Sequence, residues 1–282
     1  MPRDAGSPDV KPWYRRRRWQ VGIVVGVLLL GGAGVFAIAW SNRGAKEVAT
    51  REVVDRFRAG THSGEGSASA LRPAAGVYRY RASGTERLSI GSTEQQWGPT
   101  MPATVTHEAN GCWSLRIDYS TNHWQDQRYC TDARSLLDVG GTVFQKFDFV
   151  TFAVTDTSVF TCDPPSAVIR LDAQPGDHWP ASCTGKSSDR NTEVTSAGTN
   201  TFVGREDVVV GGTKVPALQY RLQRTLSGDQ TGTEDTHEWY SATDGLLLRA
   251  THDSRVASPS PIGDVVYTEQ GEFHLVSTQP RR

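Results

Sequence analysis

The chain has 282 residues, of which 37% are hydrophobic and 22% charged, so it is too apolar to be disordered throughout. Its net charge of −1 conceals an asymmetry. Residues 1–18 carry six basic and two acidic side chains, a charge of +4, which leaves 24 basic and 29 acidic side chains, a charge of −5, for the rest. The larger part therefore lacks the clustered basic surface that nucleic acids require, and we expect no nucleic-acid partner. Lysine occurs only five times against many arginines, which is typical of a high-GC, actinobacterial coding sequence.

An apolar segment without charged side chains, residues 19–40, follows the basic N-terminus. Its 21 steps at ~1.5 Å per residue span roughly 32 Å, close to the ~30 Å hydrocarbon core of a bilayer. Trp19 and Trp40 stand at its two ends, where amphipathic rings are favoured at the membrane interface. Only a helix satisfies the backbone in such a span. We therefore predict one transmembrane helix with the lipid bilayer as its partner.

The charges beside this segment predict its orientation. Arg15, Arg16, Arg17 and Arg18 directly precede it, so residues 1–18 are expected in the cytoplasm and the C-terminal domain outside the plasma membrane. The sequence Ala37-Ile38-Ala39 also resembles a cleavage site, but the apolar run exceeds the ~7–15 residues of a signal-peptide core. This favours an uncleaved signal-anchor and leaves cleavage after Ala39 open. A lipoprotein would need a cysteine just after the run, and the first is Cys112.

Gly22 and Gly26 form a GxxxG pair within the predicted membrane helix. Such spacing lets two helices approach closely, which suggests a weak homodimer. The simpler interpretation is that glycine is common in membrane helices.

Residues 41–75 are expected to connect the membrane helix to the folded domain. Residues 45–58 have apolar residues at helical spacing, which predicts a short amphipathic juxtamembrane helix. Residues 59–76 are rich in Gly, Ser and Ala with nothing to bury, which predicts a flexible tether. We expect this connection to lift the domain off the membrane.

Residues 76–278 are predicted to form an extracytoplasmic all-β domain. β-branched and aromatic residues alternate with polar ones between Gly- and Asp-rich turns, and no long helical period occurs. The expected fold is a large, curved, mostly antiparallel sheet, half-barrel or sandwich-like. The predicted strands are 76–82, 87–90, 103–106, 113–120, 127–131, 142–149, 167–172, 208–210, 215–226, 233–241, 246–251 and 265–276.

Two segments of this domain are alike. Residues 126–138 (DQRYCTDARSLLD) and 236–249 (THEWYSATDGLLLR) each read as a strand, a short turn and a leucine-bearing strand. The domain could contain two similar halves joined near residues 150–200. Hairpins of any large sheet also look alike, so both interpretations stay open.

The four cysteines Cys112, Cys130, Cys162 and Cys183 all lie in the predicted extracytoplasmic part. An even number in an oxidising compartment predicts two disulfides, with three possible connectivities. We favour Cys112–Cys130, which would join neighbouring strands, and Cys162–Cys183, which would hold a proline-rich crossover. A zinc site is disfavoured because no C-x-x-C pair occurs.

No catalytic, cofactor or metal residue is predicted. The G-x-S-x-G, S-x-x-K and phosphate-loop patterns are missing from the sequence, and Gly111 and Ser241 stand where the pairs His107-Glu108 and His237-Glu238 would need a second zinc-binding His. Asp229, Glu234 and Asp235 could hold calcium, but a solvated hairpin tip explains them better. His123 and His178, each beside a tryptophan, could belong to a polar-aromatic pocket, although packing at strand ends is the commoner arrangement.

The long strands and the segment from Trp239 through Asp244-Gly245-Leu246 to Arg249 resemble the half-barrel domains of LolA- and LppX-type lipid-handling proteins, over about residues 76–277. The chain departs from that pattern in lacking a lipobox cysteine and clear plugging helices, so no binding residues are carried over. The resemblance implies a non-enzymatic cell-envelope protein that binds an apolar or lipid-like ligand. The alternatives are an interaction or scaffold module for another envelope protein and, third, an enzyme.

Overall fold

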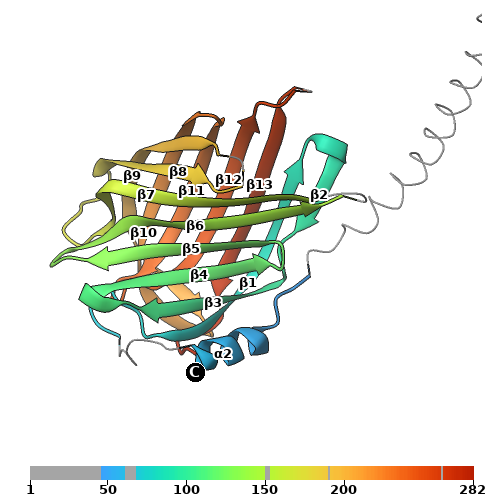
Figure 1. The fold of residues 1–282 in the computed structure, drawn as a ribbon. Helices are drawn as coiled ribbons and strands as arrows, with labels where there is room; N and C mark the ends of the chain where they lie inside the picture. Colours follow the sequence, from blue (N-terminus) through green and yellow to red (C-terminus); the bar gives the residue numbers. More distant parts are fainter. Residues whose placement is uncertain (1–45, 61–67, 150–152, 190, 262) are drawn as a thin grey trace, which may run out of the picture.

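The computed structural model describes residues 46–60, 68–149, 153–189, 191–261 and 263–282 (Figure 1). The predicted cytoplasmic tail and membrane helix, with Trp19, Trp40, Arg15–Arg18 and the Gly22/Gly26 pair, lie outside these residues. Within the described part, no helix combines the length and apolarity needed to cross a membrane.

Antiparallel strands form one continuous sheet in which almost every strand pairs with its neighbours in sequence. The sheet closes because β1 pairs with β13 over nine residues, from Tyr80–Leu275 to Leu88–Tyr267. On its other side β1 pairs first with β3 and then with the short β2, so twelve strands make a closed barrel and β2 prolongs its wall. The strands are β1 (Gly76–Leu88), β2 (Thr93–Gln96), β3 (Thr100–His107), β4 (Cys112–Ser120), β5 (His123–Thr131), β6 (Ser135–Asp148), β7 (Ala153–Arg170), β8 (His178–Ser187), β9 (Glu193–Val210), β10 (Thr213–Gly228), β11 (Thr231–Ser241), β12 (Leu247–Ser258) and β13 (Val265–Leu275).

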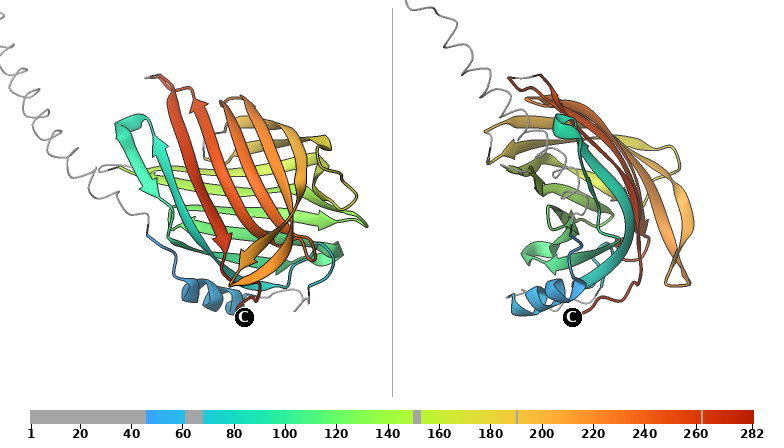
Figure 2. Two further views of the ribbon diagram at one scale, coloured as in Figure 1. Left: turned by 180° about the vertical axis from the view of Figure 1, so that it is seen from behind. Right: turned by 90° about the vertical axis from the view of Figure 1, so that its right-hand side faces the viewer.

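The predicted all-β, antiparallel class is confirmed, but the sheet is not an open half-barrel. Strands β3 to β7 run across the front of the molecule, and β10 to β13 cross behind them (Figures 1 and 2). The barrel is therefore flattened into two crossing layers, an arrangement in which inward side chains of both layers fill the space between.

One end of the barrel is closed by the segment that precedes β1. Leu71 is 2% exposed and lies in the main core, and its carbonyl accepts a hydrogen bond from Trp113 Nε1 at 3.1 Å. Tyr78 donates from its hydroxyl to the Ala74 carbonyl at 2.7 Å. We expected residues 59–76 to have nothing to bury, and this is wrong for Leu71. A lone leucine among small residues gives no periodic signal, so only the tertiary structure reveals its burial.

The helix α2 (Thr50–Ala59) lies where the amphipathic segment was predicted and covers the same end of the barrel (Figure 1). Val53 and Val54 pack with Val77 of β1 in a small apolar cluster, and Arg58 donates to the backbone carbonyl of the C-terminal Arg282 at 2.6 Å. The helix is therefore part of the folded domain. That the connection lifts the domain off the membrane stays a prediction.

Strands β7, β8 and β9 occupy the region that we expected to be a crossover between two halves. Their sequences carry prolines, glycines and many threonines, residues that weaken a strand prediction. They are nevertheless held on both sides, because β9 pairs with β10 over sixteen positions and with β8 over nine. The two hairpins of the internal similarity, β5–β6 and β11–β12, both form. Whether they mark two related halves remains a prediction.

The cysteines pair as we favoured from their spacing. Cys112 and Cys130 lie directly opposite each other on β4 and β5, with Cα atoms 4.0 Å apart. Cys162 of β7 and Cys183 of β8 form the second disulfide, with Cα atoms 4.1 Å apart. Both bonds therefore join adjacent strands of the wall. The two cysteines are 18 positions apart in the first bond and 21 positions apart in the second.

Replacing Cys162 and Cys183 together by serine is expected to lower the free energy of unfolding by about 3 kcal/mol, since the bond closes a loop of roughly 20 residues in the unfolded chain. Urea denaturation followed by near-ultraviolet circular dichroism measures the change. The Cys112/Cys130 double serine variant opens a loop of similar length and serves as the matched comparison. A loss below about 1 kcal/mol in both variants would contradict the chain-entropy argument.

Candidate functional site

The barrel encloses two adjoining cavities, called here the rim chamber and the base chamber. The rim chamber, about 580 Å³, lies at the end opposite α2, where its walls come from the ends of β1, β6, β7, β10, β12 and β13. The base chamber, about 230 Å³, lies deeper between β4–β6 and β10–β12. Five residues line both chambers, so the two cavities are adjacent: Gln125, Val143, Phe160, Leu226 and Glu234. The rim chamber alone has the volume of a small-molecule site, ~300–1,000 Å³.

Apolar side chains from both layers make up about half of the rim-chamber wall, and polar side chains, including Glu234 and Glu269, make up the rest. Strand alternation explains the apolar part, because residues two apart along a strand face the same side and these strands place aliphatic and aromatic side chains inward. Gln145 Nε2 of β6 donates a hydrogen bond to the Tyr267 hydroxyl of β13 at 2.6 Å, which links the two layers. The apolar lining consists of Leu88, Ile90, Val143, Phe147, Phe149, Val154, Phe160, Leu226, Val256 and Val265.

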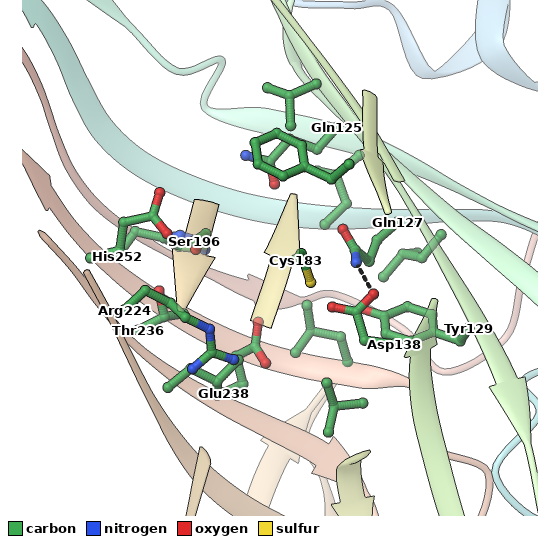
Figure 3. Close-up of a pocket in the computed structure, with 18 of the residues that line it drawn as sticks. Gln125, Gln127, Tyr129, Asp138, Cys183, Ser196, Arg224, Thr236, Glu238 and His252 are labelled. Atoms are coloured by element: carbon green, nitrogen blue, oxygen red, sulfur yellow. Dashed lines mark hydrogen bonds between the residues drawn. The ribbon is translucent and has the colours of Figure 1, made fainter. Parts of the chain in front are cut away.

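The base chamber concentrates ionisable side chains (Figure 3). Asp138 accepts from Gln127 Nε2 at 2.5 Å and from the Gly140 backbone at 2.8 Å. Glu238 accepts from the Tyr240 hydroxyl at 2.6 Å. Arg224 donates to Asn200 Oδ1 at 2.5 Å rather than to a carboxylate. The lining of this chamber thus places three acidic groups, Asp138, Glu234 and Glu238, around the Arg224 guanidinium.

Desolvation controls the protonation of these carboxyls. Burial raises the pKa of Glu238 to about 7 and that of Asp138 to about 6, and it also raises the pKa of Glu234. Burial lowers the pKa of Arg224, partly offset by Glu238 and Glu234. Near neutral pH the chamber therefore holds carboxyl groups poised between proton donor and acceptor, which suits recognition of a polar or cationic group.

The residues singled out in the sequence are distributed differently from the expectations. Glu234 faces the cavity, whereas Asp235 pairs with Arg221 outside and Asp229 accepts from the Glu193 backbone, so no calcium cluster forms among them. His178 is exposed, but His123 is fully buried and hydrogen-bonded to Glu86 rather than solvated at a strand end.

Glu238 is the cavity residue whose inward position is least predictable from the sequence. In the sequence it stands out only as part of a His-Glu pair, yet Glu234, Thr236, Glu238 and Tyr240 all line the base chamber at every second position of β11. The sequence signal for this arrangement is that these residues recur at every second position, which places them on one face of a strand. Solvated faces show the same alternation, so sequence alone does not place these charges inside.

No protein-family model matches the chain, and no curated protein matches its sequence. Several solved structures are similar, and two of them are described here. One is a hypothetical lipoprotein, YmcC, from Escherichia coli K12, with 13% identity, a TM-score of 0.35, and coverage of 72% of this chain and 86% of that one. The other is a lipoprotein described as putative from Parabacteroides distasonis, with 12% identity, a TM-score of 0.38, and coverage of 75% and 99%. Likeness at these TM-scores says nothing about the function of this chain.

Proposed function

We propose that this protein binds an amphipathic, lipid-like ligand inside its barrel, without catalysing a reaction, and that it does so outside the cytoplasm. The interior cavities carry the proposal, because apolar side chains and buried carboxyl groups line both chambers. A ligand of matching polarity would bury its apolar part against these walls and place its polar head among Asp138, Glu234 and Glu238. Two disulfides support an oxidising compartment.

The shape of the barrel supports entry from the rim. Leu71, α2 and the C-terminal segment cover the opposite end, where Val77 also exchanges two 2.8 Å backbone hydrogen bonds with Arg281. The rim has no described element across it that corresponds to α2 (Figure 2). A ligand would therefore enter between the strand ends and penetrate toward the base.

Replacing Val143 by tryptophan is expected to remove the bound ligand, because Val143 lines both chambers and an indole there would fill the space where they meet. The measurement is mass spectrometry of lipids extracted from the purified full-length chain. Val203→Trp is the matched control, since Val203 is 41% exposed and outside the cavity. The full chain also carries the predicted membrane segment, whose lipids would be common to all variants.

A lipid-like species is expected with the wild type and Val203→Trp and reduced at least about tenfold with Val143→Trp, equivalent to about 1.4 kcal/mol. The same lipid profile in all three proteins would overturn the proposal and favour an interaction module. Thermal unfolding of each variant without added ligand verifies that Val143→Trp is folded.

A further inference from the structure

A second group of buried ionisable side chains lies at one edge of the cavity. Glu86 of β1, His123 of β5 and Glu269 of β13 each offer a ligating atom, and these atoms all lie within 4.8 Å of one another. The three residues are 1%, 0% and 6% exposed. They are distant in sequence and meet because the closure of the barrel brings β13 against β1.

The surrounding side chains orient Glu86. Its carboxylate accepts from Gln95 at 2.6 Å, from Trp97 Nε1 at 2.9 Å and from His123 Nδ1 at 2.5 Å. The Trp97 ring lies against the paired glycines Gly84 and Gly271, where any added Cβ would come within 2.5 Å of it. Metal ligands in proteins are held in the same way, because hydrogen-bond partners behind them fix their orientation.

Glu269 is held by a similar chain of donors from the other side. Tyr267 donates to Oε2 of Glu269 at 2.6 Å, and Gln145 donates to the Tyr267 hydroxyl at 2.6 Å. Among the described residues, Oε1 of Glu269 is buried without a hydrogen-bond partner, and so is Nε2 of His123. Two buried polar atoms of these three residues are thus left without a hydrogen-bond partner, at a considerable energetic cost.

The cluster combines two carboxyl groups with one imidazole, and all three residues are buried. A divalent cation among them would be shared by both carboxylates and would supply a partner for Oε1 of Glu269.

We propose that Glu86, His123 and Glu269 form a binding site for a divalent transition-metal cation, for which Zn²⁺ is the probe. One imidazole and two carboxylates are a ligand set that zinc accepts. Glu269 also lines the rim chamber, so the cation would be reachable from the cavity.

The test is equilibrium dialysis of the full-length, tag-free chain against Zn²⁺, with the bound metal measured by elemental mass spectrometry. One Zn²⁺ per chain is expected for the wild type, with at least a tenfold weaker affinity for Glu269→Gln and His123→Gln. Glu238→Gln is the matched control, since Glu238 is another cavity carboxyl with a raised pKa that lies outside the group. It should bind Zn²⁺ as the wild type does.

The change in thermal unfolding temperature on adding Zn²⁺ provides a second measurement, because a ligand that binds only the folded state stabilises it. Zn²⁺ should raise the unfolding temperature of the wild type and of Glu238→Gln, and leave that of the folded Glu269→Gln unchanged. A wild type that binds no stoichiometric Zn²⁺, or a Glu269→Gln variant that binds it equally well, would overturn the proposal and identify the cluster as a buried ion pair. Neither result bears on ligand binding in the chambers.

Discussion

Replacing Trp113 by alanine is expected to lower the free energy of unfolding by about 3–5 kcal/mol, the range typical of a buried tryptophan. Trp113 is 0% exposed, its ring packs against Tyr129 with centroids 4.7 Å apart, and its indole N–H donates to the Leu71 carbonyl. The substitution leaves a large cavity and releases the segment that closes the end of the barrel. Urea denaturation of the full-length chain measures the loss.

Trp124→Ala provides the control for this prediction. Trp124 lies on the neighbouring strand β5, is only partly buried, and packs against Phe144 and the Arg116 guanidinium on the outer side of the wall. Its removal should cost about 1 kcal/mol, the size of a partly exposed cation–π contact. Equal losses of unfolding free energy in the two variants would show that the contact between Trp113 and the Leu71 segment does not stabilise the barrel.

The second large effect is expected in the dependence of stability on pH. Burial raises the pKa of Glu238 from 4.5 to about 7, so the folded protein binds this proton more tightly than the unfolded chain does. The contribution of this proton to the free energy of unfolding is fully present below about pH 4 and is lost as the pH rises through 7. Glu238→Gln cannot ionise and should be more stable than the wild type at pH 8 by about 1–2 kcal/mol, with little difference near pH 4.

This magnitude is below the roughly 3 kcal/mol that the full pKa shift would give, because the carboxyl lines a cavity instead of being enclosed by packed atoms. Denaturation midpoints of both proteins between pH 4 and 8 measure the difference. Glu272→Gln is the control, since Glu272 lies on the exposed surface beside Arg249. If the difference between Glu238→Gln and the wild type does not grow with pH, Glu238 is ionised in the folded protein.

The sequence predicted those strands whose faces differ clearly in polarity. The alternation in β1 and β4 marks one buried and one more exposed face, and the cysteine spacing correctly favoured bonds between adjacent strands. The amphipathic period of residues 45–58 likewise predicted a helix that the structure shows at Thr50–Ala59. In each case a local pattern reflects a local structural requirement.

The barrel closure, the buried Leu71 and strands β7–β9 depend on tertiary contacts. The pairing of β1 with β13 joins residues such as Tyr80 and Leu275, which are far apart in sequence and carry no mutual signal. Strand β9, rich in Thr and Gly, becomes a strand because its neighbours satisfy its backbone hydrogen bonds on both sides.

The candidate sites depend on the same contacts. Alternation along a strand shows that Glu234 and Glu238 share a face, but a sequence does not show whether that face is turned to solvent or to a cavity. Glu86, His123 and Glu269 come together only when the sheet closes. Local patterns were enough for the β class, for the disulfide-bonded strand pairs and, as a prediction, for the membrane-anchored N-terminus. The contents of the barrel follow from tertiary structure alone, because an interior is defined by contacts between strands that are distant in the chain.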